Sequence, residues 1–151
     1  LENRLPLGEL PMTVTYHDHC DLGRGGRVFD EPREVMARIP GLKLVEMEHN
    51  RRHCLCCGGG GNLEMIDPDL SAAMSKRKVE EAVRTGAQAI LTNCQHGVRP
   101  LTSDAKRNTV ISDVLDMSQL VARSLQAHAS EAKARAESAA QAVQAAASAQ
   151  A

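Results

Sequence analysis

Aromatic residues are almost absent from this sequence. Tyr16 and Phe29 are the only two, and there is no tryptophan. A chain of 151 residues is typical of one domain, so aliphatic side chains must build nearly all of its core. The sequence also lacks an excess of charge of either sign, because 18 Lys and Arg residues face 19 Asp and Glu residues. A balanced charge gives no sign of a basic surface that would bind nucleic acid or an anionic membrane, and we expect no nucleic-acid partner.

Long apolar runs and a signal peptide are absent too. No segment approaches the roughly 20 consecutive apolar residues that cross a bilayer. The chain starts at Leu1 rather than Met, which we interpret as a fragment of a longer soluble polypeptide, with residues 1–11 as a leader from an upstream region. The five cysteines are an odd number, which fits a secreted disulfide framework poorly. They favour a reducing compartment with metal or redox use.

Strand-like and helix-like segments alternate along the chain. The expected strands are 13–17, 42–48, 87–93 and 109–116. The expected helices are 30–41, 67–86 and 117–126. This order predicts an α/β fold with a small parallel sheet and right-handed helical crossovers.

The helix at 67–86 has the clearest signals. Asp67 can cap it, Pro68 suits its first turn and Gly86 can end it. Four apolar residues are expected to share its buried face: Leu70, Met74, Val79 and Val83. Asp30 is the expected N-cap of the helix before it, whereas residues 20–27 are too rich in glycine for a helix and are predicted to be a loop.

All five cysteines follow predicted strands. Cys20 follows the first strand, Cys54, Cys56 and Cys57 follow the second, and Cys94 follows the third. Because the carboxyl ends of parallel strands meet at one edge of a sheet, we expect a cysteine site there. Without metal, Cys56, Cys57 and Cys94 are expected to be exposed and reactive on their loops, more so than Cys54.

The stretch CLCCGGGGN (54–62) places two cysteines side by side before four glycines. Adjacent side chains of extended backbone point to opposite sides, so Cys56 and Cys57 do not easily close on one tetrahedral zinc. A cluster of several irons can take neighbouring thiolates on different irons, and glycines let backbone N–H groups approach its sulfides. The pattern therefore favours an iron-sulfur cluster over simple zinc.

The spacing of these cysteines resembles that of a known family. Cys20 is followed after 35 residues by CCG at 56–58, and after 36 more by Cys94. This is similar to the cysteine-rich CCG domain of heterodisulfide reductases and of the iron-sulfur subunits of anaerobic glycerol-3-phosphate, glycolate and lactate oxidoreductases. The likeness includes YHDHCDLGR (16–24) and covers roughly residues 12–101.

The resemblance implies a noncubane [4Fe–4S] cluster used in electron transfer and, in heterodisulfide reductases, in disulfide cleavage. Its ligands would be Cys20, Cys56, Cys57 and Cys94. The family pattern ends in C-x-x-C, but Gly97 stands where its second cysteine is expected. An iron one thiolate short would take water, an outside thiol, Cys54 or His96. We therefore expect weak iron binding that Gly97→Cys improves.

Other polar residues near the cysteines have two interpretations each. His17, His19 and His96 could donate protons to a leaving thiolate or complete a metal shell, or they could be hydrogen-bonded loop residues. Arg24 and Arg99 could stabilise a negative cluster or be solvated.

Cys54 lies outside the family motif and is expected to be an ordinary buried thiol, with ligation as the alternative. The glycines 58–61 form neither GxxxxGK[ST] nor a G-x-G-x-x-G turn after the first strand, so phosphate binding is not expected.

Residues 12–125 are thus expected to form an iron-sulfur electron-transfer domain of a heterodisulfide reductase-like oxidoreductase complex, with disulfide reduction as one candidate reaction. The alternative is a zinc-binding or metal-free interaction domain that lost redox activity through Gly97. Expected partners are subunits or domains that carry conventional iron-sulfur clusters or flavin. The expected location is cytoplasmic, with association to a membrane through those partners left open.

Residues 126–151 have 13 alanines in 26 positions and are expected to be a low-complexity tail, or a frayed helix continuing from residue 116.

Overall fold

The computed structural model describes residues 5–107 and 110–148. Its centre is a sheet of four parallel strands: β1 (Met12–Tyr16), β2 (Leu42–Leu44), β3 (Ala89–Thr92) and β4 (Asp113–Asp116). The strand order is β2-β1-β3-β4, so β1 and β3 are central. The predicted α/β class with a parallel sheet is confirmed.

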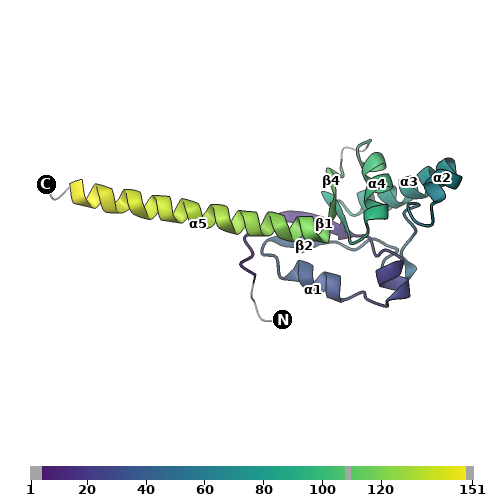
Figure 1. Ribbon diagram of the computed structural model, residues 1–151, viewed down its shortest axis with the longest axis horizontal. Coiled ribbons are helices and arrows are strands. Elements are labelled where there is room, and N and C mark those ends of the chain that lie inside the picture. Colours follow the sequence, from purple (N-terminus) through teal and green to yellow (C-terminus); the bar gives the residue numbers. More distant parts are fainter. Residues whose placement is uncertain (1–4, 108–109, 149–151) are drawn as a thin grey trace.

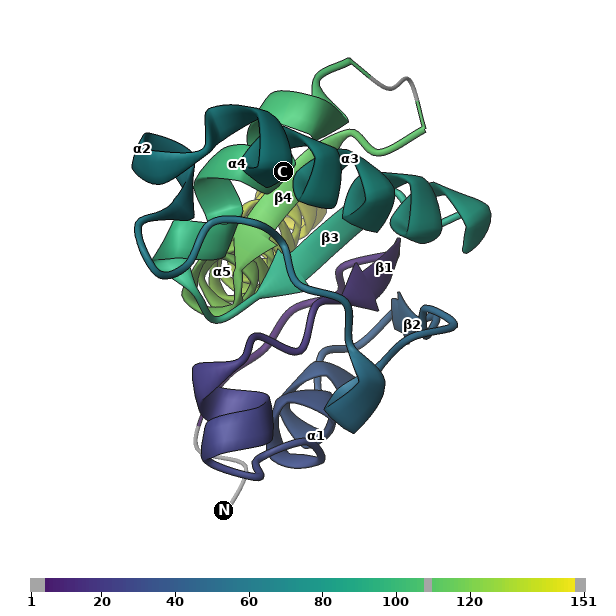
Figure 2. The same cartoon turned by 90° about the vertical axis from the view of Figure 1, so that its right-hand side faces the viewer.

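Helices cover both faces of the sheet. They are α1 (Glu31–Ala37), α2 (Leu63–Ile66), α3 (Pro68–Arg84), α4 (Gln95–Ala105) and α5 (Met117–Ser148). Figure 2 shows α3 and α4 on one side of the sheet and α1 on the other. Two short helical turns, at Asp21–Gly25 and Arg51–His53, lie in the loops that follow β1 and β2.

Each face of the sheet has its own apolar core. Val14, Leu91 and Leu115 point to the face that α1 and the start of α5 cover, where Met36 and Leu120 close the core. The opposite face packs under α3 and α4 through Ile90, Val114, Val79, Leu101 and Ala105. Alternate residues of β3 thus enter different cores, and all four of its residues are buried.

The second strand is shorter than predicted. It ends at Leu44, after which the Val45 N–H still donates to the Val14 carbonyl at 2.8 Å. Beyond this point the chain leaves the sheet edge: Glu46 binds Arg33 on one side, while Met47 is buried in the core under α3. The fourth strand begins only at Asp113, and its predicted residue Thr109 lies outside the described residues.

Besides the short α2 and the turn at Arg51–His53, two further segments that were not predicted to be helical form helices. Residues 21–25 form a π-type turn, in which the Gly25 N–H donates to the Cys20 carbonyl at 2.9 Å. Residues 95–105 form α4, although this segment contains Gly97 and Pro100. Pro100 and Gly97 are both buried, so tertiary packing outweighs the low helix propensity of these residues.

The helix predicted at 67–86 is α3, and its cap is confirmed. The Leu70 N–H donates to the Asp67 carboxylate at 3.0 Å, and Gly86 has the positive φ of a C-terminal glycine, +72°. Its predicted apolar face is wrong in part, because Leu70 is 48% exposed. The buried face instead carries Ser71, Ser75, Lys78, Val79, Glu81 and Ala82. Asp30 is the N-cap of α1 without a capping hydrogen bond; its carboxylate pairs with Arg51.

Helix α5 projects from the body as one long helix (Figure 1). Its first turns are fixed by the N-terminal segment: the Gly8 N–H donates to the Ser124 carbonyl at 2.9 Å, and the Ser124 hydroxyl donates to the Gly8 carbonyl at 2.8 Å. Farther along, the side chains from Glu131 to Ala142 are exposed. None of the helices that the structure describes is both long and apolar enough to span a membrane.

Candidate functional site

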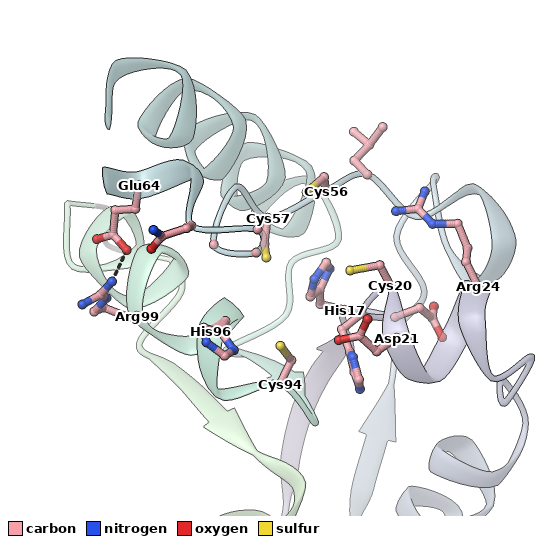
Figure 3. Close-up of a pocket in the computed structure, with 17 residues that line it drawn as sticks. His17, Cys20, Asp21, Arg24, Cys56, Cys57, Glu64, Cys94, His96 and Arg99 are labelled. Atoms are coloured by element: carbon pink, nitrogen blue, oxygen red, sulfur yellow. Dashed lines mark hydrogen bonds and ion pairs between the residues drawn. The ribbon is translucent and has the colours of Figure 1, made fainter. Parts of the chain in front are cut away.

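One pocket lies at the carboxyl ends of the strands, where the strand order reverses between β1 and β3 (Figure 3). Its volume is about 340 Å³. Cys20, Cys56, Cys57 and Cys94 all line it, although they come from three different loops. The topology therefore brings together the four cysteines that are predicted as ligands, whereas Cys54 is not among the lining residues.

The cysteines surround the pocket rather than meet at one point. Cys20 is exposed, Cys56 and Cys94 are half-buried, and Cys57 is 7% exposed. Among the described residues, no group of three or more Cys, His, Asp or Glu side chains is close enough to hold a single metal ion.

The glycines after the cysteines let the loop pack tightly. Gly58 has φ of +78°, and a Cβ there would lie 3.2 Å from the carbonyl carbon of Ser71, whose hydroxyl donates to the Gly58 carbonyl at 2.8 Å. A Cβ on Gly59 would lie 2.8 Å from the carbonyl carbon of His96. The Gly58 N–H also donates to the Cys56 sulfur at 3.4 Å.

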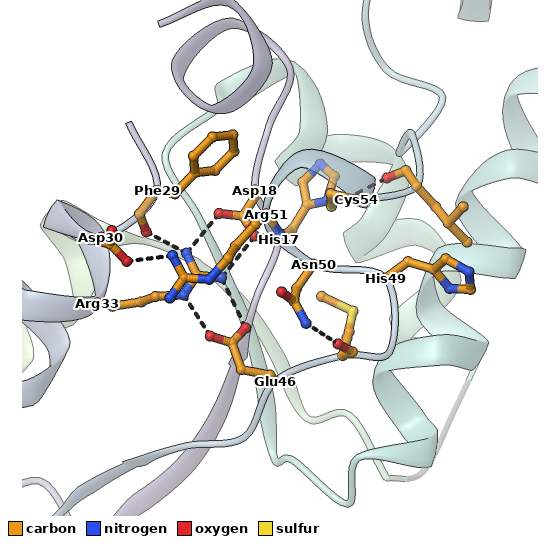
Figure 4. Close-up of polar contacts among 12 residues, drawn as sticks. His17, Asp18, Phe29, Asp30, Arg33, Glu46, His49, Asn50, Arg51 and Cys54 are labelled. Atoms are coloured by element: carbon orange, nitrogen blue, oxygen red, sulfur yellow. Dashed lines mark hydrogen bonds and ion pairs between the residues drawn. The ribbon is translucent and has the colours of Figure 1, made fainter. Parts of the chain in front are cut away.

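A partly buried arginine joins the loops that carry the cysteines (Figure 4). Arg33 of α1 makes a bidentate contact with Asp18 at 2.8 and 2.9 Å, and it also binds Glu46 at 2.9 Å. Asp18 accepts a further hydrogen bond from the Arg51 backbone N–H at 2.6 Å. Because Asp18 precedes Cys20 and Arg51 precedes Cys54, this network fixes one cysteine loop against the other.

At the wall of the pocket, His17 forms a buried pair with Cys54, which does not line the pocket. The Nδ1 of His17 lies 3.3 Å from the Cys54 sulfur, and both residues are at most 3% exposed. Burial lowers the pKa of His17 to about 3, so the imidazole is neutral. Burial raises the pKa of the Cys54 thiol, and the charge and hydrogen bond of Lys78 oppose that rise. The expectation of a buried Cys54 is confirmed.

The other polar residues around the pocket have different surroundings. His19 lines the pocket, its Nδ1 is buried without a hydrogen-bond partner among the described residues, and burial lowers its pKa. His96 is exposed on α4. Arg24 donates to the Cys54 carbonyl at 3.3 Å and Arg99 pairs with Glu64; both arginines line the pocket and are exposed to solvent.

Alkylation of the metal-free protein should follow the exposure of the thiols. The expectation that Cys57 is an exposed, reactive thiol is wrong, because the glycine loop folds inward and burial raises the pKa of Cys57 to about 11. We expect iodoacetamide to label Cys20 first, Cys56 and Cys94 next, and Cys57 and Cys54 last. Peptide mass spectrometry over time measures the order, and early labelling of Cys57 would contradict the buried loop.

The model of the CCG cysteine-rich domain family matches residues 14–97. This range includes the four cysteines of the pocket. The chain belongs to this family.

Three curated relatives illustrate the setting of the domain. A subunit of the dihydromethanophenazine:CoB--CoM heterodisulfide reductase of Methanosarcina barkeri is 40% identical over 115 residues, which are 75% of this chain and 28% of the relative. The "Probable iron-sulfur-binding oxidoreductase FadF" of Bacillus subtilis is 34% identical over 122 residues, 80% of this chain and 17% of the relative.

A subunit of the fumarate reductase (CoM/CoB) of Methanothermobacter marburgensis is 41% identical over 83 residues, 55% of this chain and 16% of the relative. The chain therefore spans less than a third of the length of each of these relatives. No solved structure matches it.

Proposed function

We propose that this domain holds an iron-sulfur cluster in the pocket at the carboxyl ends of the strands and passes electrons within a larger oxidoreductase complex. The observation that carries this proposal is the convergence of Cys20, Cys56, Cys57 and Cys94 on one pocket. Thiolates are the soft donors that iron-sulfur clusters take. The names of the relatives, an iron-sulfur-binding oxidoreductase and subunits of two reductases, support the same chemistry.

The surroundings of the cysteines fit such a cluster. The pocket of about 340 Å³ has room for several irons and sulfides, and its cysteines are spread around it. Glycine backbone at 58–61 adjoins the sulfurs, and the cations Arg24 and Arg99 lie on the lining. When bound, the cluster supplies one-electron redox chemistry, while the chain sets its potential through hydrogen bonds, burial and nearby charge. The noncubane [4Fe–4S] type, proposed from the family resemblance, is the cluster that we expect.

The proposal includes partner subunits that carry conventional iron-sulfur clusters or flavin. It places the complex in the cytoplasm or attached to a membrane. The names of the Methanosarcina and Methanothermobacter relatives describe subunits, which supports a domain that works with other chains. Disulfide reduction is the candidate reaction, because the first of these names is that of a heterodisulfide reductase.

Anaerobic reconstitution tests the proposal. Purified chain incubated with ferrous iron and sulfide should become brown, bind iron and acid-labile sulfide in similar amounts, and give a paramagnetic resonance signal in one redox state. Cys56→Ser should lose most of the bound iron, while Ser130→Ala, at an exposed position of α5 outside the pocket lining, serves as the control. A chain that takes up zinc tightly but no sulfide would contradict the proposal and favour the zinc-binding alternative.

A further inference from the structure

Gly97 stands where the family pattern has a cysteine, and the structure shows what surrounds this position. A Cβ on Gly97 would lie 3.3 Å from the Cys57 sulfur and 3.9 Å from the Cys94 Cβ. The Cδ2 of His17 would lie 3.8 Å from the same Cβ. The side chain that a cysteine at 97 would carry therefore borders the imidazole ring of His17.

His17 is oriented as a metal-binding histidine would be. Its Nδ1 is 3.3 Å from the Cys54 sulfur, so the other edge of the ring, with Cδ2 and the adjacent Nε2, faces away from Cys54. His17 lines the pocket, and in Figure 3 its ring stands between Cys20, Cys57 and Cys94.

The contact with Cys54 occupies only one nitrogen of His17. The Cys54 sulfur lies 3.3 Å from Nδ1 of His17 and 3.6 Å from the Leu55 carbonyl oxygen. In the tautomer whose Nδ1–H donates to this sulfur, the lone pair of the ring is on Nε2. A histidine that donates one ring N–H to a neighbour and offers the other nitrogen is the usual arrangement at protein metal sites.

The other candidates to replace the missing cysteine are placed less well. Cys54 is turned to Leu55 and His17 and is absent from the pocket lining. His96 is exposed on α4, and His19 is not among the three nearest neighbours of the Cβ position at residue 97.

We propose that Nε2 of His17 replaces the missing cysteine as an iron ligand, so that this chain holds its cluster with the four pocket cysteines and one histidine. The inference rests on the proposed function, since it assigns a ligand of the same cluster. It changes the expected behaviour of the site: the chain as it stands has a complete ligand set rather than an iron one ligand short.

Pulsed paramagnetic resonance on the reconstituted wild-type chain tests the inference directly. We expect a hyperfine coupling to nitrogen that changes when histidine alone is labelled with ¹⁵N, because a bound imidazole nitrogen carries unpaired spin. His96→Gln and His19→Gln should retain this coupling, and His17→Gln should lose it. The wild-type measurement requires no substitution at a buried site, so it holds even if His17→Gln folds poorly.

Iron retention and reduction potential give a second test. His17→Ala should release iron to a chelator on the order of 10-fold faster than wild type, and adding Gly97→Cys in the same chain should restore retention. The restored, all-cysteine chain should have a more negative potential than wild type, because histidine in place of cysteine raises the potential of iron-sulfur centres.

The outcomes separate the inference from the function on which it rests. A wild-type chain that binds no cluster would overturn both. A cluster without histidine coupling, with iron release unchanged in His17→Ala, would overturn the His17 assignment alone and leave the proposed function standing.

Discussion

Glu81→Gln should destabilise the metal-free protein by about 3–5 kcal/mol, because it leaves a buried ammonium without its counter-charge. Lys78 and Glu81 lie on the sheet-facing side of α3, with side chains 0% and 1% exposed and an ion pair of 2.9 Å. Glu81 also accepts hydrogen bonds from the N–H and Nδ1 of His49, at 2.6 and 2.9 Å. Urea unfolding followed by circular dichroism measures the loss, which is a large share of the stability of a typical domain.

Glu80→Gln is the matched control on the same helix. Its partner Lys76 is 3.9 Å away, and both side chains are more than half exposed, so we expect a loss below about 0.5 kcal/mol. Replacing both buried charges with Lys78→Met and Glu81→Leu should recover most of the stability lost in Glu81→Gln. Equal losses of stability in Glu81→Gln and Glu80→Gln would contradict the stabilising role of the buried ion pair.

The same pair makes stability depend on pH in a defined direction. Burial alone would raise the pKa of Glu81, but hydrogen bonds from Lys78 and His49 outweigh burial and hold the pKa below its usual 4.5. A lowered carboxyl pKa contributes stability that is complete above pH 4.5 and is lost as the pH falls through the folded pKa. Glu81→Gln should therefore lack this part of the acid sensitivity of the wild type.

The sheet and the gathering of the cysteines were predictable from the sequence, because both follow from topology. Strand-like and helix-like segments alternate, and parallel strands place their carboxyl ends at one edge. No comparable signal marks the buried face of α3. Lys78 and Glu81 look like solvated helix residues in the sequence, and only the three-dimensional packing shows that they neutralise each other out of contact with water.

The details of the site depended on contacts between residues far apart in the chain. Histidines near the cysteines could be recognised as possible ligands, but nothing in the sequence distinguishes His17 from His96. The distinction comes from Cys54, which fixes one nitrogen of His17, and from the approach of His17 to Gly97, 80 positions later. Similarly, nothing in the sequence indicates a role for Arg33, which binds both Asp18 and Glu46 in the structure.

Gly59→Ala should disrupt the cysteine pocket more than Gly60→Ala. Gly59 and Gly60 are the two glycines of the run 58–61 that do not have a positive φ. The added methyl would lie 2.8 Å from the carbonyl carbon of His96 and 3.0 Å from Cγ of Pro100, so it meets backbone and a rigid ring rather than a flexible side chain. Relief requires the loop that carries Cys57 to separate from α4. Overpacking of this kind costs about 1–3 kcal/mol, occasionally more, and urea unfolding measures it.

Gly60→Ala is the control that isolates this clash. A Cβ on Gly60 meets nothing within 4 Å, and Gly60 is not among the glycines with positive φ, so the substitution should change stability by less than about 0.5 kcal/mol. The two variants differ by one position but should differ strongly in iron bound after reconstitution. When the loop separates from α4, Cys57 moves away from Cys94 and from the ring of His17. A cluster bound by these residues would then have to span a wider gap. Equal iron content in Gly59→Ala and Gly60→Ala would mean that Cys57 does not depend on its contact with α4 to reach the cluster.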